Sequence, residues 1–248
     1  MKLTHDAFLG GQLVIAQPDK GYRAATDPVF LAAACPAQDG DTVLELGCGV
    51  GVAALCLLRR QNGVRATGIE IQPDYAALAR ENAATNDLLL DVVEGDIAAL
   101  PADLKEQSFD HVIFNPPFFK DGHVVGPADT GRTIAHVEAL KLTDWCDVAL
   151  RRLKPKGTVT IIQRAERLDA ILEGLSSRVG DLKIRPLAPR RGRAARRVIV
   201  QARKSSKAPL QLLAPFYIHD GSSHVADGDD FSAAANAILR DGEALPMS

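Results

Sequence analysis

The sequence lacks the features that mark exported and membrane proteins. No apolar run approaches the roughly 20 residues that a bilayer-spanning helix needs. The N-terminal stretch MKLTHDAFLGG has no apolar segment of signal-peptide length. The four cysteines (35, 48, 56 and 146) show neither the spacing of a metal site nor the density of a disulfide framework. We therefore expect a cytosolic protein with reduced thiols, no membrane segment and no bound metal.

Aromatic residues are also scarce, at 5% of the chain, whereas 46% of the 248 residues are hydrophobic, enough for one large core. Strand-like and helix-like segments alternate, which predicts an α/β, Rossmann-like doubly wound fold. We expect a seven-stranded, mostly parallel sheet with helices on both faces. The expected strands are 41–46, 65–70, 91–96, 109–114, 157–163, 182–187 and 196–202, and the expected helices 51–60, 73–86, 136–153 and 166–178. No helix separates the last two strands, which predicts an antiparallel edge hairpin.

The chain is expected to have three parts. Residues 1–40 read as a short hairpin followed by a capping helix, and residues 41–204 contain the alternating core. Residues 205–248 read as an extension that begins in a linker, KSSKAP (204–209), and continues with one strand, an Asp220-Gly221 turn and a helix near 231–240.

A glycine-rich turn, Gly47-Cys-Gly49-Val-Gly51, follows the first core strand and precedes a helix. Backbone without Cβ atoms can approach a nucleotide-like ligand closely. A dinucleotide-binding turn would place its third glycine where Val52 stands. Packing alone can also favour such glycines, so the turn by itself leaves both interpretations open.

Two carboxylates end the next two strands. Glu70 ends the second strand, 70 − 49 = 21 residues after Gly49, the interval expected of a carboxylate that bonds ribose hydroxyls. Asp96 ends the third strand, where it could accept a hydrogen bond from an adenine amino group.

The fourth strand stops at Asn115-Pro116-Pro117-Phe118. Proline fixes its own φ and restricts the residue before it, so this turn is rigid. The carboxyl ends of parallel strands form the crevice in which open α/β sheets bind ligands. We therefore expect Asn115 to lie at a binding site.

These segments stand in an order that resembles class I S-adenosylmethionine-dependent methyltransferases over residues 10–203. The resemblance implies S-adenosyl-L-methionine as the cofactor. It implies that the glycine turn surrounds the methionine portion, that Glu70 binds the ribose and that Asp96 lies near the adenine. The full set of implied cofactor contacts in this part of the chain is Glu45, Gly47, Gly49, Gly51, Glu70, Ile71, Asp96, Ile97 and Asn115.

The resemblance further implies methyl transfer to a planar amino nitrogen. The Asn115 side-chain oxygen and the Pro116 carbonyl would accept the hydrogen bonds of that amine, and they would strengthen as positive charge develops. Phe118 would stack on the base. The implied catalytic residues are thus Asn115, Pro116 and Phe118.

The segment of residues 21–32, which precedes the core, points to one family among the class I methyltransferases. Gly21-Tyr22-Arg23, with Asp27, Val29 and Leu31, is similar to the entry segment of the bacterial tRNA1(Val) adenine-N6-methyltransferase family. In that family the segment covers the cofactor, which implies Tyr22, Thr26 and Asp27 as contacts. Asp27 could equally cap a helix that has Pro28 in its first turn.

A run without acidic residues extends from Leu182 to His219 and contains ten lysines and arginines, in a chain of net charge −2. Such a concentration indicates a nucleic-acid partner, with Arg190, Arg191 and Arg193 as the expected phosphate contacts. A solvated edge hairpin would give the same pattern.

The sequence therefore predicts an enzyme that methylates N6 of an adenine in RNA, most simply tRNA. The alternatives are a methyltransferase acting on a protein amide or a small molecule, and a cofactor-binding RNA chaperone without turnover. A nicotinamide oxidoreductase is disfavoured by Val52 and by the absence of a Tyr/Lys pair near the crevice.

Overall fold

The computed structural model describes residues 2–21, 23–117, 140–221 and 230–248. Its strands are β1 (Leu3–Phe8), β2 (Leu13–Pro18), β3 (Thr42–Leu46), β4 (Arg65–Glu70), β5 (Leu90–Glu94), β6 (Phe109–Phe114), β7 (Leu153–Arg164), β8 (Val179–Ala188), β9 (Arg197–Lys204), β10 (Gln211–Leu212) and β11 (Phe216–Tyr217). Its α-helices are α1 (Asp27–Ala34), α2 (Val52–Arg60), α3 (Pro73–Thr85), α4 (Ala102–Glu106), α6 (Leu142–Arg152), α7 (Leu168–Leu175) and α8 (Ala233–Asp241). Short 3-10 turns lie at Leu9–Gly11 (η1), Ile97–Ala99 (η2), Ala165–Arg167 (η3) and Ser176–Arg178 (η4).

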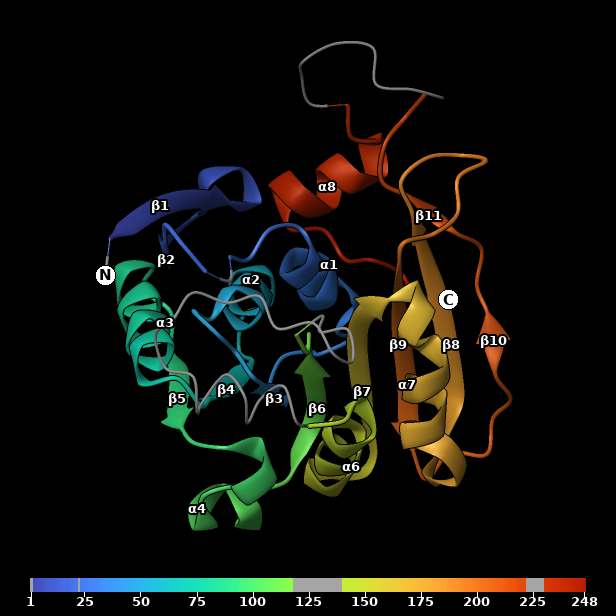
Figure 1. Cartoon of the computed structure of the whole chain (residues 1–248), viewed down its shortest axis with the longest axis horizontal. Coiled ribbons are helices and arrows are strands. Elements are labelled where there is room, and N and C mark those ends of the chain that lie inside the picture. Colours follow the sequence, from blue (N-terminus) through green and yellow to red (C-terminus); the bar gives the residue numbers. More distant parts are fainter. Residues whose placement is uncertain (1, 22, 118–139, 222–229) are drawn as a thin grey trace.

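The central sheet has the order β10-β8-β9-β7-β6-β3-β4-β5, and β11 also pairs with β8. Strands β3 to β7 run parallel, while β9 runs antiparallel to both β7 and β8. This arrangement, visible in Figure 1, confirms the predicted mostly parallel fold with its antiparallel pair. The tail adds two strands to β8, both parallel to it, where the sequence predicted a single strand.

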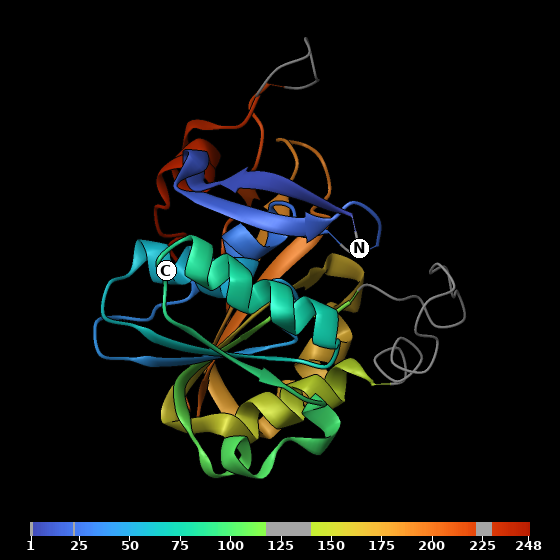
Figure 2. The same ribbon diagram turned by 90° about the vertical axis from the view of Figure 1, so that its left-hand side faces the viewer.

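The two faces of the sheet are covered by different helices (Figures 1 and 2). Helices α1, α2 and α3 cover one face, while α4, α6 and α7 cover the other. Alternate residues of β6 serve the two layers: Ile113 packs beneath the first set, and Val112 and Phe114 beneath the second. Phe114 stacks on Trp145 of α6 at 5.9 Å between ring centroids. Each layer therefore has its own apolar core, and the sheet is buried between them.

The N-terminal hairpin β1–β2 is joined to helix α3 by two asparagines one helical turn apart. Asn82 accepts a hydrogen bond from Ala16 N at 2.7 Å and donates to Ala16 O, and Asn86 makes the same pair of bonds with Val14. Their amides thus replace a neighbouring strand for β2. Asn82 is 1% exposed and also donates to Val50 O in the glycine turn, at 3.0 Å.

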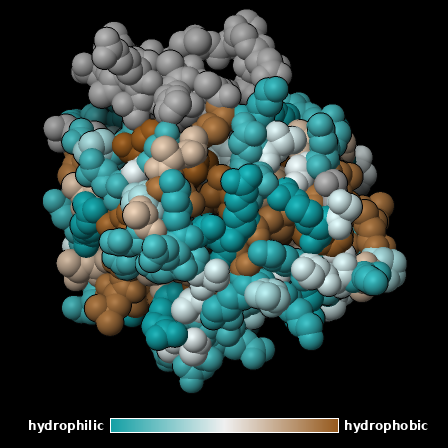
Figure 3. Space-filling model, turned by 90° about the horizontal axis from the view of Figure 1, so that it is seen from below, coloured by the Kyte–Doolittle hydropathy of each residue, from teal (hydrophilic) through white to brown (hydrophobic). Residues whose placement is uncertain are grey.

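The C-terminal segment packs beside the N-terminal one (Figure 2). The side chain of Gln12 donates to Arg240 O of α8, and Leu245 N donates to Ala33 O of α1. A division of the chain at residues 40 and 204 stays a prediction. The face seen from below in Figure 1 is mostly polar, with small apolar areas between the polar side chains (Figure 3). Over the part of the chain that the structure describes, every helix is too short or too polar to cross a bilayer.

Candidate active site

The three glycines of the turn between β3 and α2 have different surroundings, although all have positive φ. A Cβ atom at Gly47 would lie 2.7 Å from the ring of Trp145, so this glycine is required by packing. A Cβ atom at Gly49 would meet nothing within 4 Å. The backbone at Gly49 is therefore open to a ligand, which is what the motif predicted for the turn as a whole.

Glu70 fixes the position of this open backbone. Its Oε2 accepts a hydrogen bond from Gly49 N at 2.9 Å, and its Oε1 accepts one from Gln72 N at 2.9 Å. Burial raises the pKa of Glu70, and the backbone N–H groups that it binds oppose that shift. The backbone of Ile71 and the side chain of Gln72 also interact with this carboxylate, so a ribose hydroxyl would take the place of one of these donors at its roughly four acceptor positions.

Glu45 serves the start of helix α2. The side chain is 5% exposed, and its Oε2 accepts a hydrogen bond from Ala54 N at 2.8 Å. Burial, aided by the neighbouring charge of Glu70, raises the pKa of Glu45 to about 8. The structure thus gives Glu45 a helix-capping bond beneath the glycine turn, and its predicted contact with the cofactor stays a prediction.

The end of β5 lies beside that of β4, because Gly95 N donates to the carbonyl of Glu70 at 2.9 Å. Asp96 caps the 3-10 turn η2 by accepting a hydrogen bond from Ala98 N at 2.8 Å. Ile97 is 7% exposed and packs into the core beneath α6. Glu70, Ile71 and Asp96 therefore lie on one edge of the sheet, as the sequence predicted.

Asn115 and Pro116 follow β6 on the same edge. Strand β6 pairs with β3 so that Phe114 lies opposite Leu46, which places Asn115 beside the first residue of the glycine turn. Asn115 is partly buried and Pro116 is buried. Phe118, the predicted stacking partner, lies outside the described residues.

A residue that the sequence analysis missed contacts this turn. Gln163, 3% exposed, is the penultimate residue of β7 and donates from Nε2 to the Pro116 carbonyl in a long hydrogen bond of 3.4 Å. Its Oε1 accepts a bond from Arg164 N at 2.7 Å, so the amide orientation is fixed. The one available signal was a polar residue at the end of the apolar strand GTVTIIQ.

In the entry segment, residues 21–32, the role of Asp27 at the start of α1 differs from the predicted one. Thr26 occupies the cap position of α1, and Asp27 is the first helical residue, so the interpretation of Asp27 as the cap is wrong. The Asp27 carboxylate instead accepts a hydrogen bond from Arg197 Nε at 2.8 Å, 170 residues away. Contacts of Thr26 and Asp27 with a cofactor stay predictions, and Tyr22 lies outside the described residues.

The fold places the basic residues between Leu182 and His219 at two opposite ends of the sheet. Strand β9 is antiparallel to β7, so the turn of residues 189–196 lies on the carboxyl edge with Asn115, whereas Arg203 lies at the opposite end. Arg190 is 9% exposed and binds the Asp230 carboxylate and the carbonyl of Asp220. It is therefore unavailable to phosphate, which corrects the prediction at that position. Arg191 and Arg193 are exposed, and their role stays a prediction.

The residues on this edge fit S-adenosyl-L-methionine. Open backbone at Gly49 suits close approach of the ligand, and the oriented carboxylate of Glu70 suits vicinal hydroxyls. Sheet order, glycine turn and carboxylate together define a class I methyltransferase.

Comparison with known proteins assigns the family. The family model described as methyltransferase small domain matches residues 23–179, and the chain belongs to this family. It is an S-adenosyl-L-methionine-dependent methyltransferase, as the sequence predicted.

Several relatives carry the name tRNA1(Val) (adenine(37)-N6)-methyltransferase, among them two from different organisms. One, from Porphyromonas gingivalis, is 34% identical over 172 residues, which cover 66% of this chain and 67% of that protein. The other, from Actinobacillus pleuropneumoniae, is 27% identical and covers 81% of this chain and 84% of that protein.

Two solved structures have a similar fold. A predicted O-methyltransferase of Agrobacterium tumefaciens has a TM-score of 0.69 at 26% identity, covering 88% of this chain and 97% of that one. A methyltransferase of Pyrococcus furiosus has a TM-score of 0.56 at 18% identity, covering 78% of this chain and 90% of that one, and supports the fold alone.

Proposed function

We propose that the enzyme transfers the methyl group of S-adenosyl-L-methionine to the N6 amine of an adenine in tRNA. The observation that carries the proposal is the position of Asn115-Pro116 beside the glycine turn, at the carboxyl edge shared by β3 and β6. The two named tRNA methyltransferases support the choice of acceptor. Action on tRNA would place the enzyme in the cytoplasm.

The exocyclic amine of adenine is a weak nucleophile because its lone pair is delocalised into the ring. The Asn115 side-chain oxygen and the Pro116 carbonyl would each accept a hydrogen bond from one N–H of the amine. These bonds would localise the lone pair on the nitrogen. These hydrogen bonds strengthen as the nitrogen becomes positive, which stabilises the transition state more than the ground state. The bound cofactor supplies the electrophilic methyl group.

The rigidity of the turn matters for this chemistry. Pro116 and Pro117 each have a fixed φ, and Asn115 precedes a proline, so the acceptors are oriented before the substrate binds. Gln163 holds the Pro116 carbonyl from the neighbouring strand. A hydroxyl acceptor would need one such hydrogen bond, whereas an amino group uses two.

The test is methyl transfer to defined acceptors. Purified protein is incubated with S-adenosyl-L-methionine and total tRNA from a strain without the gene, and the digested RNA is analysed for N6-methyladenosine by mass spectrometry. Wild type should form this nucleoside, and the Asn115→Ala variant should form it far more slowly. Methylation of a protein amide or of a hydroxyl, with tRNA unchanged, would refute the proposal in favour of those acceptors.

A further inference from the structure

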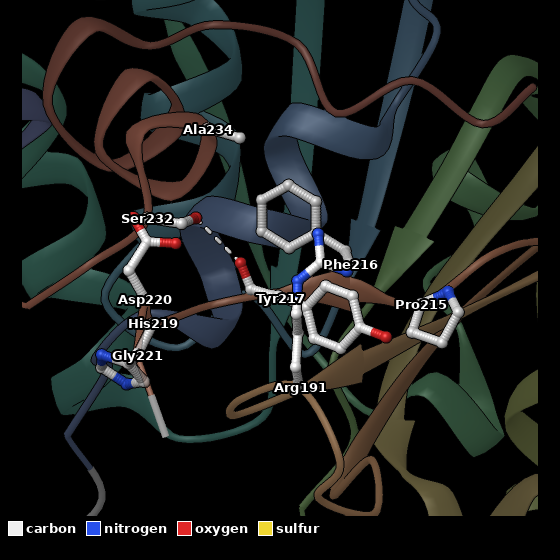
Figure 4. A pocket seen from close by; sticks show the side chains of 9 residues that line it. All are labelled: Arg191, Pro215, Phe216, Tyr217, His219, Asp220, Gly221, Ser232 and Ala234. Carbon is white, nitrogen blue, oxygen red and sulfur yellow. Dashed lines mark hydrogen bonds between the residues drawn. The ribbon is translucent and has the colours of Figure 1, made fainter. Parts of the chain in front are cut away.

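A cavity of about 520 Å³ lies where β11 pairs with the end of β8, at the outer end of the carboxyl edge and three strands from β6. Figure 4 shows the side chains that line it. Its walls come from the β8–β9 turn, from β11 and from the start of α8. Side chains that line it include those of Arg191, Pro215, Phe216, Tyr217, Asp220 and Ser232. Its size lies within the range of small-molecule sites. We call it the edge cavity.

The walls of the edge cavity are held by specific contacts. Strand β11 pairs with the end of β8, and the ring of Phe216 packs edge-on against Phe30 at 5.7 Å between centroids. Ser232 Oγ donates to Tyr217 O at 2.8 Å and accepts from Ala235 N, so it joins β11 to the N-terminus of α8. The backbone around the cavity is thus fixed by contacts that need no ligand.

Neighbouring arginines have opposite roles here. Arg190 points inward and pairs with the Asp230 carboxylate, whose Oδ1 also lies 2.6 Å from His219 Nδ1. Arg191 is exposed, and its guanidinium lies over the ring of Tyr217 at 5.0 Å from the centroid. Figure 4 shows the Arg191 side chain extended alongside that ring. The Tyr217 ring therefore orients the Arg191 guanidinium, and the N–H donors of this group lie at the mouth of the cavity.

The lining matches the chemistry of one nucleotide. Guanidinium groups bind phosphate oxygens, and RNA bases stack on aromatic rings and on guanidinium planes. Asp220, an exposed carboxylate on the cavity wall, disfavours a second phosphate and can accept a hydrogen bond from a base amino group.

The cavity also lies at a suitable distance from the methylation site. From β6 to β8 is three strand spacings and from β6 to β11 four, which corresponds to about 14–19 Å along the edge. A few nucleotides of a single strand can cover that span. The exposed turn with Arg193 and Arg196 lies between the two positions.

We propose that the edge cavity binds one nucleotide flanking the target adenine in the RNA strand, with its phosphate on Arg191 and its base against Tyr217. This inference rests on the proposed function, because the strand must enter the active site at Asn115. It predicts that RNA is recognised at two separate points on the carboxyl edge.

The experiment measures affinity for a tRNA transcript that wild type methylates, and for transcripts with an abasic nucleotide at single positions beside the target adenine. Arg191→Ala and Tyr217→Ala should each weaken binding by tenfold or more. Arg191→Ala should also reduce the salt slope by about 0.7, the value for one phosphate contact on a single strand. Tyr217→Phe keeps the ring and should bind as wild type. Arg203→Ala removes an exposed arginine at the opposite end of the sheet and is the matched control.

At one position the abasic nucleotide should weaken binding to wild type at least tenfold, yet have little effect on binding to Tyr217→Ala. Cofactor affinity and melting temperature, measured for every variant, show that each is folded. Binding within twofold of wild type for both Arg191→Ala and Tyr217→Ala, with methylation of the transcript retained, would overturn the nucleotide site alone. Failure of wild type to methylate any tRNA would overturn the proposed function and this inference together.

Discussion

Replacement of Glu70 by glutamine separates two roles of one carboxylate. In the structure its two oxygens accept hydrogen bonds from Gly49 N and Gln72 N, each at 2.9 Å. Glutamine keeps one acceptor oxygen and presents an amide NH₂ where the second was, so one of these backbone donors loses its partner. The charged acceptor for the ribose hydroxyls is lost as well.

Hydrogen bonds to a charged group contribute roughly 1.5–3 kcal/mol, which corresponds to a loss of roughly 10- to 100-fold in affinity. We expect Glu70→Gln to weaken S-adenosyl-L-methionine binding by that factor in isothermal titration calorimetry, and to lower the melting temperature. Glu94→Gln is the matched control, because Glu94 lies opposite Glu70 in the β4–β5 register and is exposed. Cofactor affinity within threefold of wild type would show that Glu70 only supports the turn, and the fit to the ribose would be rejected.

Three further substitutions test the site. Asn115→Ala should leave cofactor affinity within a few-fold of wild type and lower the single-turnover rate by roughly 10²–10³, the cost of one preoriented polar group; an unchanged rate would refute amine activation. Gln163→Leu should lower kcat about tenfold, on the order expected for a misoriented Pro116 carbonyl, without changing cofactor affinity, and an unchanged kcat would limit Gln163 to packing. The pKa of Glu45 is about 8 in the folded state and 4.5 when the side chain is in water. Between these pH values the folded state therefore keeps a proton on Glu45 that the unfolded state has released. This residue's contribution to stability therefore falls as pH rises from 4.5 to 8, and the melting temperature of Glu45→Gln relative to wild type should rise over that range; a constant difference would contradict the shift.

Local patterns were sufficient for much of the core. Strands β4 and β6 have the predicted bounds, because a proline soon after each strand, Pro73 and Pro116, closes it. The glycine turn, Glu70 and Asp96 were also located from sequence, since strand ends in a parallel sheet share one edge. In each case the information lies within a few residues of the feature.

Long-range partners could not be predicted in the same way. The Asp27–Arg197 pair and the Arg190–Asp230 pair join residues that are distant in sequence, and nothing local distinguishes Arg190 from Arg191. Strands β10 and β11 have two residues each and are defined only by their pairing with β8. Such features depend on tertiary packing, which overrides local preference.

The Asn82 amide has a consequence for exchanging parts between relatives. One buried side chain binds both the hairpin, at Ala16, and the glycine turn, at Val50. Both hairpin bonds are made to backbone atoms, so a chimera that takes its first 21 residues from a relative keeps them unless a proline replaces Ala16. The requirement falls on position 82 alone: the asparagine must be kept for an exchanged hairpin to remain joined to the glycine turn.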